Sequence, residues 1–377
     1  MPSREHRLLL ACARAVLTGE PAADAGLLDG VDAGRLRELA AVHGMAPLLA
    51  PFLASFGAAA APLRAAFRGR FLDDARSGLA LTAELLPTVR GLEARGIPVV
   101  AYKGPALALQ AYGDASLRHF ADLDLLVPPE ALEAAVAALQ ELGFASQPFA
   151  SAGQRRAVIR DGHHLTFTRG PVVLELHWRF SKRVFGFAES LGGVMARRTT
   201  VALRGVAVPV LSPEDHMLAL AMHASRGLWS TVEATLAIAV LARSLPDEAW
   251  PEVLRRAEAW KGARALRVSL LLAGELFAAP APAPLHTFLR ADGATRALVA
   301  DIAGRTLGEP RSPAWYLRTQ LALRGGAPQK LAFLLRSLFV TTPSDWSAAR
   351  PSRGGMALAR LGRPLRLLRK FRRRRSL

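Results

Sequence analysis

Apolar residues recur at spacings of three and four in the first 95 residues, which is the period of an amphipathic helix. Segments 35–42 and 81–95 show the period clearly, and Gly96 follows the second as a helix stop. Segment 40–63 is long and free of formal charge, but glycine and several prolines interrupt it. It therefore predicts two buried helices with a break rather than a membrane span.

The pattern changes after Gly96, where short apolar and β-branched runs alternate with brief helical segments. Helices are predicted at 106–112 and from Pro128 to about Leu142. Turns at 169–171 and 204–205 predict two hairpins. Strands are predicted at 97–102, 123–127, 144–149, 163–168 and 172–178, and as a pair within 201–211.

The helical period returns at Ser212, a predicted N-cap that is followed by a first-turn proline. Helical segments continue to about residue 340, with breaks at 279–284 and 325–326. We therefore predict an α+β fold, in which a small mixed-sheet core is flanked by N- and C-terminal helical regions. The predicted division is an N-terminal helical region 1–95, a core 96–212, a C-terminal helical region 213–340 and a basic tail 341–377.

Positive charge is concentrated at the C-terminal end. Residues 350–377 contain ten arginines, one lysine and no acid, so they supply +11 of the formal net charge of +18. In one interpretation, Met356, Leu361, Leu365 and Leu368 form a helical face that docks on an anionic membrane or nucleic acid. In the other, which we favour, a helix packs through Leu361–Leu368 and ends in a solvated basic run.

The single cysteine, Cys12, excludes an intramolecular disulfide and a cysteine-based zinc site, and we predict a small buried helix residue there. Arg14 interrupts the apolar run near the N-terminus, which argues against a signal peptide. We expect a cytoplasmic protein without a transmembrane segment, peripheral to the membrane if the basic tail docks there.

Two aspartates, Asp122 and Asp124, stand at the start of the apolar run 123–127. On a strand, residues i and i+2 point to the same face, so both carboxylates would project together. Such a pair repels itself unless a cation lies between its members, and Mg²⁺ prefers oxygen ligands of this kind. The sequence therefore predicts a metal site on this strand.

A strand, a glycine turn and a helix follow one another at Lys103-Gly104-Pro105. This arrangement aims free backbone N–H groups at a phosphate, and Gly104 permits close approach. Lys103 could contact the phosphate directly. An ordinary turn is the alternative, but the aspartate pair 18 residues after Gly104 favours a phosphate-binding turn.

Arg118 has two interpretations, as a clamp on a triphosphate or as a structural partner of Asp122. Glu175 shares a predicted strand face with Val173 and His177, and a buried acid is costly unless it is paired or binds metal. Glu175 would complete the metal site or accept a proton from the attacking hydroxyl. His177 would assist or bind substrate, or be structural, and the pair His163-His164 is interpreted mainly as structural.

Four segments together form a recognisable pattern: Tyr102–Ala106, Leu117-Arg118, Ala121–Val127 and Leu174–Trp178. In these segments the chain resembles the uncharacterised nucleotidyltransferase family of bacteria, within the superfamily of DNA polymerase beta. Further similarity lies at His43–Leu49, Leu211–His216, Thr342–Asp345 and Arg363–Leu367. The resemblance implies that Asp122 and Asp124 bind metal, that Glu175 is the third acid, and that Mg²⁺ or Mn²⁺ and an NTP such as ATP are used.

Two departures from the resemblance matter. The wider superfamily has Gly-Ser or Gly-Gly where this chain has Gly104-Pro105, so phosphate binding would depend on Gly104, Lys103 or Arg118. The family also carries an acid in the middle of a later helix, where only Glu233 is nearby.

The predicted function is transfer of an NMP group from an NTP to an unknown acceptor, which could be a small molecule, a peptide, a protein or RNA. The alternative is a non-catalytic nucleotide- or partner-binding protein that keeps the fold. A glycosyltransferase would need a larger nucleotide-binding α/β region before the aspartates, and a haloacid-dehalogenase phosphatase would need an early Asp-x-Asp followed by a glycine-rich turn.

Overall fold

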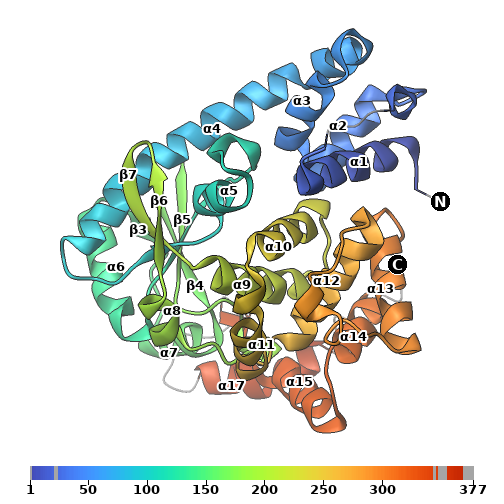
Figure 1. Ribbon diagram of the computed structural model, residues 1–377. Helices are drawn as coiled ribbons and strands as arrows, with labels where there is room; N and C mark the ends of the chain where they lie inside the picture. Colours follow the sequence, from blue (N-terminus) through green and yellow to red (C-terminus); the bar gives the residue numbers. More distant parts are fainter. Residues whose placement is uncertain (1, 21–23, 343–344, 347–354, 368–377) are drawn as a thin grey trace.

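A seven-stranded sheet lies between two helical layers in the computed structural model (Figure 1), which describes residues 2–20, 24–342, 345–346 and 355–367. The predicted α+β class is confirmed. The strands are β1 (Val100–Ala101), β2 (Leu123–Leu126), β3 (Ala145–Ser146), β4 (His164–Arg169), β5 (Val172–His177), β6 (Thr199–Leu203) and β7 (Val206–Val210).

The strands follow the order β3-β4-β5-β2-β1-β7-β6. β2 runs parallel to β5, and β1 runs parallel to β7 with Ala101 opposite Val210. The other neighbours are antiparallel, so the sheet is mixed, as predicted. Each strand overlaps a run predicted from the sequence, and the tight turn of the β6–β7 hairpin lies at Arg204-Gly205, where both residues have a positive φ.

Alternate residues of the central strands enter different hydrophobic clusters, as the pleat of a strand requires. Leu123 and Leu125 of β2 pack with α4 (Ala61–Glu93) and α6 (Leu132–Glu141) on one face of the sheet. Leu126 packs on the other face, which Asp124 shares. That second face is covered by α5 (Gly104–Tyr112), α9 (Pro213–Arg226) and α10 (Val232–Ser244).

The N-terminal and C-terminal helices share one hydrophobic cluster, although the sheet separates them in sequence. α4 extends into both clusters, because Phe67 packs in the larger one and Leu85 in the smaller one. The division of the chain into four regions stays a prediction. The helices that pack together from the two ends are α1 (Arg4–Thr18), α2 (Ala33–Val42), α3 (Ala46–Ala54), α12 (Ala263–Phe277) and α13 (Gly293–Thr306).

Two helices within the core were not predicted. α7 (Ala152–Asp161) buries only Ala157, Val158 and Asp161, so its sequence lacks a long apolar period. α8 (Leu191–Ala196) is a helix of 6 residues with two internal glycines. The remaining helices are α11 (Trp250–Ala259), α14 (Pro313–Ala322), α15 (Ala327–Phe339) and α17 (Gly355–Leu361).

Segment 40–63 is broken, as predicted, but it holds the end of α2, the whole of α3 and the start of α4 instead of two helices. Within the described residues, no helix is long and apolar enough to cross a membrane. Cys12 is buried on α1, as predicted, and burial raises the pKa of its thiol.

The prediction that the tail packs through its leucines is wrong for the part that the structure describes. Leu361 is 69% exposed and Leu365 is 61% exposed. Arginines attach this segment instead, since Arg363 and Arg366 pair with the buried Asp345. Leu368 and the basic run 372–375 lie outside the described residues.

Candidate active site

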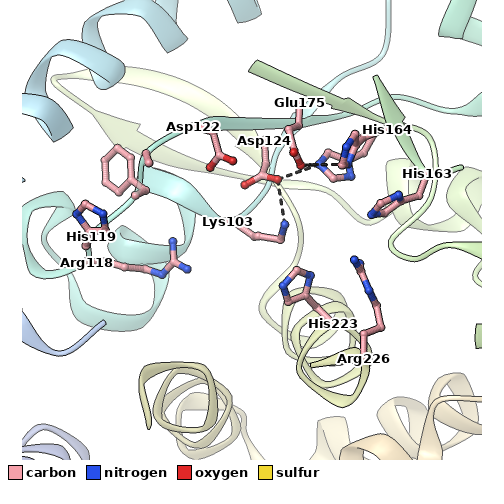
Figure 2. Close-up of a pocket in the computed structure, with 13 residues that line it drawn as sticks. Lys103, Arg118, His119, Asp122, Asp124, His163, His164, Glu175, His223 and Arg226 are labelled. Carbon is pink, nitrogen blue, oxygen red and sulfur yellow. Dashed lines mark hydrogen bonds and ion pairs between the residues drawn. The ribbon is translucent and has the colours of Figure 1, made fainter. Parts of the chain in front are cut away.

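The acidic side of the site is built on the central parallel strands. Asp124 on β2 lies directly opposite Glu175 on β5 in the strand register, so both side chains project from the same face of the sheet. Asp122 precedes β2 and is not part of it, which corrects the expectation that both aspartates lie on the strand. Figure 2 shows the three carboxylates along one wall of a pocket.

Two nitrogens, one of a lysine ammonium and one of a histidine ring, contact the buried carboxylate of Asp124. The ammonium Nζ of Lys103 lies 3.0 Å from Oδ1, and Nε2 of His177 lies 2.8 Å from the same oxygen. Burial alone would raise the pKa of Asp124, but Lys103 and His177 outweigh it and hold this pKa well below its usual range. Asp124 is therefore a carboxylate with a fixed orientation at neutral pH.

Glu175 contacts two histidine rings. Its Oε2 lies 3.1 Å from Nδ1 of His164 and 3.2 Å from Nε2 of His177. Although burial raises it, the pKa of Glu175 is held well below its ordinary value by these rings. His163 stacks beside His164, with ring centroids 4.4 Å apart, and both histidines line the pocket. They therefore form part of the site, beyond the mainly structural role expected of them.

Asp122 differs from the other two acids, because none of the described residues donates a hydrogen bond to its carboxylate. Burial raises its pKa, and the nearby Asp124 and Glu175 carboxylates raise it further. An acid that other acids destabilise is stabilised by a cation, and hard oxygen ligands suit Mg²⁺ or Mn²⁺. Ligand atoms of Asp124, Glu175 and His177 also lie within 4.8 Å of one another. The residues present therefore fit a divalent metal ion.

The turn between β1 and α5 has an unusual backbone. Lys103 has φ 56° and Gly104 has φ 44°, both in the left-handed region. A lysine there is strained and needs support from its surroundings. The support comes from α9, since the main-chain N–H of Lys103 donates to Nε2 of His216 at 3.2 Å. The amide of Lys103 is thus already used, which leaves its ammonium and Gly104 for a phosphate.

His216 was not singled out from the sequence, although it closes the motif Leu211–His216. Its Nδ1 donates to Oε1 of Gln110 at 2.5 Å, and Gln110 donates in turn to the carbonyl of Leu211 at 2.7 Å. Burial lowers the pKa of His216 to about 3, with help from Arg118 and Lys103. The ring is therefore neutral, and its tautomer is fixed by the two neighbours.

Arg118 pairs with Glu233 of α10 and not with Asp122, so that expected partner was wrong. Its Nε lies 2.9 Å from Oε1 of Glu233, which also accepts from the hydroxyl of Tyr112 at 3.2 Å. A Cβ added at Gly44 would lie 3.2 Å from Cβ of Glu233. Glu233, which departs from the family pattern in the sequence, therefore connects Arg118 to the His43–Leu49 segment.

The wall opposite the acids belongs to α9, through His223 and Arg226 (Figure 2), neither of which was singled out from the sequence. Burial lowers the pKa of each. The cavity measures about 430 Å³, and all the predicted site residues except Gly104 line it. Its lining consists of Lys103, Arg118, His119, Phe120, Ala121, Asp122, Asp124, His163, His164, Glu175, His177, His223 and Arg226.

The sequence profile of the family described as "Uncharacterised nucleotidyltransferase" matches residues 29–278, which is more than half of the chain. The protein belongs to this family of nucleotidyltransferases. The resemblance inferred from the motifs is thereby confirmed.

Among solved structures, the chain is similar to the solution structure of the antibiotic-resistance factor ANT(2'')-Ia, with 15% identity and a TM-score of 0.35. The match covers 48% of this chain and 91% of that chain. The crystal structure of ANT(2'')-Ia with adenylyl-2''-tobramycin matches with 15% identity and a TM-score of 0.34, over 48% of this chain and 96% of that chain. No curated protein matches the sequence.

Proposed function

We propose that the protein transfers an NMP group from an NTP to an acceptor hydroxyl with the help of Mg²⁺ or Mn²⁺. The observation that carries this proposal is the set of three carboxylates on one wall, with Asp124 and Glu175 in register and Asp122 without a hydrogen-bond donor among the described residues. Family membership supports the reaction class.

Asp122, Asp124 and Glu175 would hold the metal. When bound, the ion would polarise the reacting phosphate and stabilise the departing pyrophosphate. The low pKa of Glu175 favours a ligand role over a general-base role, because an efficient base has a pKa near the working pH. His177 would keep the Asp124 and Glu175 carboxylates oriented, since its ring lies between them.

The donor nucleotide would lie against the cationic part of the pocket. Lys103, Arg118 and Arg226 line it together, which suits the charge of a triphosphate. The cavity of about 430 Å³ lies within the usual range for small-molecule sites. The acceptor is a small molecule, a peptide or a protein hydroxyl, and we propose a cytoplasmic location, which the lone buried Cys12 supports.

The alternative is a non-catalytic protein that binds nucleotide or a partner. Two observations favour it: Gly104-Pro105 offers no serine hydroxyl, and the Lys103 amide is occupied by His216. Such a protein would bind an NTP without releasing pyrophosphate.

The test measures pyrophosphate release and NTP binding for all four NTPs, with Mg²⁺, with Mn²⁺ and with a chelator, in the presence of cell lysate as acceptor source. We expect metal-dependent release, which Asp122→Asn, Asp124→Asn and Glu175→Gln each abolish. Glu130→Gln is the matched control, since Glu130 is exposed and does not line the pocket. Binding without release supports the nucleotide-binding alternative, and the absence of both contradicts the enzymatic proposal and the nucleotide-binding alternative.

A further inference from the structure

One helix leaves nearly all of its apolar residues uncovered. Of the side chains in α15, only that of Phe333 is buried. The exposed leucines recur at positions i, i+3, i+4 and i+7, so they form a single stripe along the helix. They are Leu331 (57% exposed), Leu334 (37%), Leu335 (48%) and Leu338 (37%).

The segment 358–365 carries a second row of exposed leucines. Leu358 and Leu361 of α17 are 70% and 69% exposed, and Leu365 in the next helical turn is 61% exposed. α15 and α17 lie side by side at the lower edge of the molecule (Figure 1), where Arg363 donates to the carbonyl of Ser337 at 3.2 Å.

The two rows supply seven of the twelve large exposed hydrophobic side chains in the described part of the chain. Such a concentration of apolar surface marks an interaction site. We call these seven leucines the leucine face.

The charged residues of the segments that carry the leucine face are almost all basic. The described residues between 310 and 367 contain eight arginines and lysines and a single acid, Asp345. Asp345 is 4% exposed and pairs with Arg363 and Arg366, so it presents no negative charge to a partner. Lys330 and Arg360, on the two helices, are exposed cations. The two helices therefore combine exposed apolar side chains with basic ones, and neither contains an acid.

We propose that the leucine face docks on the surface of an anionic lipid bilayer. Helices that lie in a membrane interface insert an apolar face among the acyl chains while their basic residues contact the headgroups. Each basic residue near an anionic surface adds to the attraction. Nucleic acid would satisfy the cations but would leave seven leucines in water. A second copy of the chain would bring two positive faces together, which is unfavourable.

The surface is distinct from the active site, and the inference does not rest on the proposed reaction. α15 packs on the loop after β5, where Phe333 lies against Phe185 with ring centroids 6.4 Å apart and Arg336 donates to the carbonyl of Val184 at 3.3 Å. These contacts use the inner side of α15 and leave its leucine stripe outward.

The experiment is sedimentation of the full chain with phosphatidylcholine vesicles, with and without phosphatidylserine. We expect binding only to the anionic vesicles and weakening at high salt. Leu334→Ser/Leu335→Ser/Leu338→Ser should lower the partition at least tenfold, and a thermal unfolding curve checks that this variant is still folded. The control, Val42→Ser/Leu72→Ser/Leu79→Ser, replaces three residues elsewhere that are 64%, 44% and 57% exposed, and it should bind as the unmodified protein does.

Three outcomes would overturn the inference. The first is no binding of the unmodified chain to anionic vesicles, or binding that the leucine substitutions leave unchanged. The second is complete loss of binding on truncation after Leu367 while the leucine variant still binds, which would assign the contact to the basic end alone. The third is a dimer in analytical ultracentrifugation that the leucine substitutions dissociate, since a second copy would then cover the face.

Discussion

The main-chain N–H of Lys103 donates a hydrogen bond to the ring of His216, a residue 113 positions later. Gln110 holds the opposite ring nitrogen, so the acceptor nitrogen always faces Lys103. Backbone strain of about 1–3 kcal/mol is expected for a lysine with positive φ, and this contact compensates for part of it. The same turn aims the Lys103 ammonium at Asp124. His216 is therefore a positioning residue for the cationic side of the pocket.

His216→Ala should lower kcat/KM for the NTP roughly 10- to 100-fold, because the turn relaxes and Lys103 moves. His216→Gln, whose amide oxygen can accept the same N–H, should recover most of the affinity for nucleotide. The rate of pyrophosphate release at varied NTP concentration measures kcat/KM, and isothermal titration with a non-hydrolysable NTP measures the affinity. His286→Ala, at an exposed position, is the control. A loss of stability with unchanged nucleotide affinity would assign His216 a purely structural role.

Variants of the Arg118–Glu233 pair distinguish the two interpretations of Arg118, as a clamp on a triphosphate or as a structural partner of an acid. Arg118→Met should destabilise the fold by about 3–5 kcal/mol, because it leaves the buried Glu233 carboxylate without its cation. Arg118→Met/Glu233→Leu should recover most of that stability. Urea unfolding measures both.

Nucleotide affinity should stay low in the double variant. Only Nε of Arg118 contacts Glu233, and among the described residues no partner of the other guanidinium nitrogens is found. Those nitrogens are directed toward the cavity in Figure 2. Recovery of nucleotide affinity together with stability would instead show that Arg118 serves only as the partner of Glu233.

Acid should destabilise the protein from below about pH 6.5. Burial lowers the pKa of His43 to about 4 and that of His216 to about 3, whereas both bind a proton near 6.5 when unfolded. The unfolded chain therefore binds more protons in this window, and stability falls as the pH falls. Each histidine should cost about 2 kcal/mol between neutral pH and pH 5.

Urea unfolding at the two pH values measures this loss. His216→Gln should show a shallower pH dependence, whereas the exposed control His286→Gln should not. The carboxylates with lowered pKa values, Asp124 and Glu175, lose their stabilising charge only at lower pH and do not interfere. Equal pH dependence in all three proteins would contradict the assignment.

Asp345 fastens the segment after α17 to the body of the protein, because its partners Arg363 and Arg366 follow the end of that helix. Its carboxylate accepts from Arg366 at 2.7 Å, from the Thr342 amide at 2.9 Å, and from Arg363. Asp345→Ala should cost about 3 kcal/mol of local stability, because buried ion pairs lose this much when one partner is removed. Hydrogen exchange in α17 should quicken while kcat/KM is unchanged. Asp29→Ala, at an exposed site, is the control, and unchanged exchange would contradict the role.

The strands of the sheet could be predicted because their periods are local. In β2, leucines surround the single acid Asp124, and Val172 to His177 alternate between two faces. α7 could not, because its few buried residues give no extended period. The shared cluster of the N- and C-terminal helices could not be predicted either, since contacts such as those of α1 with α10 depend on tertiary packing and leave no mark in either segment.

Tertiary packing also limits how much of the site could be predicted from the sequence. Asp124 and Glu175 stand out because acids in apolar strands are unusual, and the parallel pairing brings them together. His223 and Arg226 look like ordinary polar residues of a helix, and only the position of α9 against the sheet makes them part of the pocket. Glu233 looked like a departure from the pattern because its partner, Arg118, lies 115 residues earlier.

The pairing of β1 with β7 has a consequence for the order in which the protein is made. Ala101 cannot pair with Val210 before β7 has been synthesised, and the strained turn at Lys103 has no support before His216 has been synthesised. Such distant contacts close long loops and form slowly. On the ribosome, a chain that ends before α9 would already contain all three acids but could not yet hold the Lys103 turn. The acidic wall can therefore exist in a nascent chain, and the complete pocket only after α9 has docked.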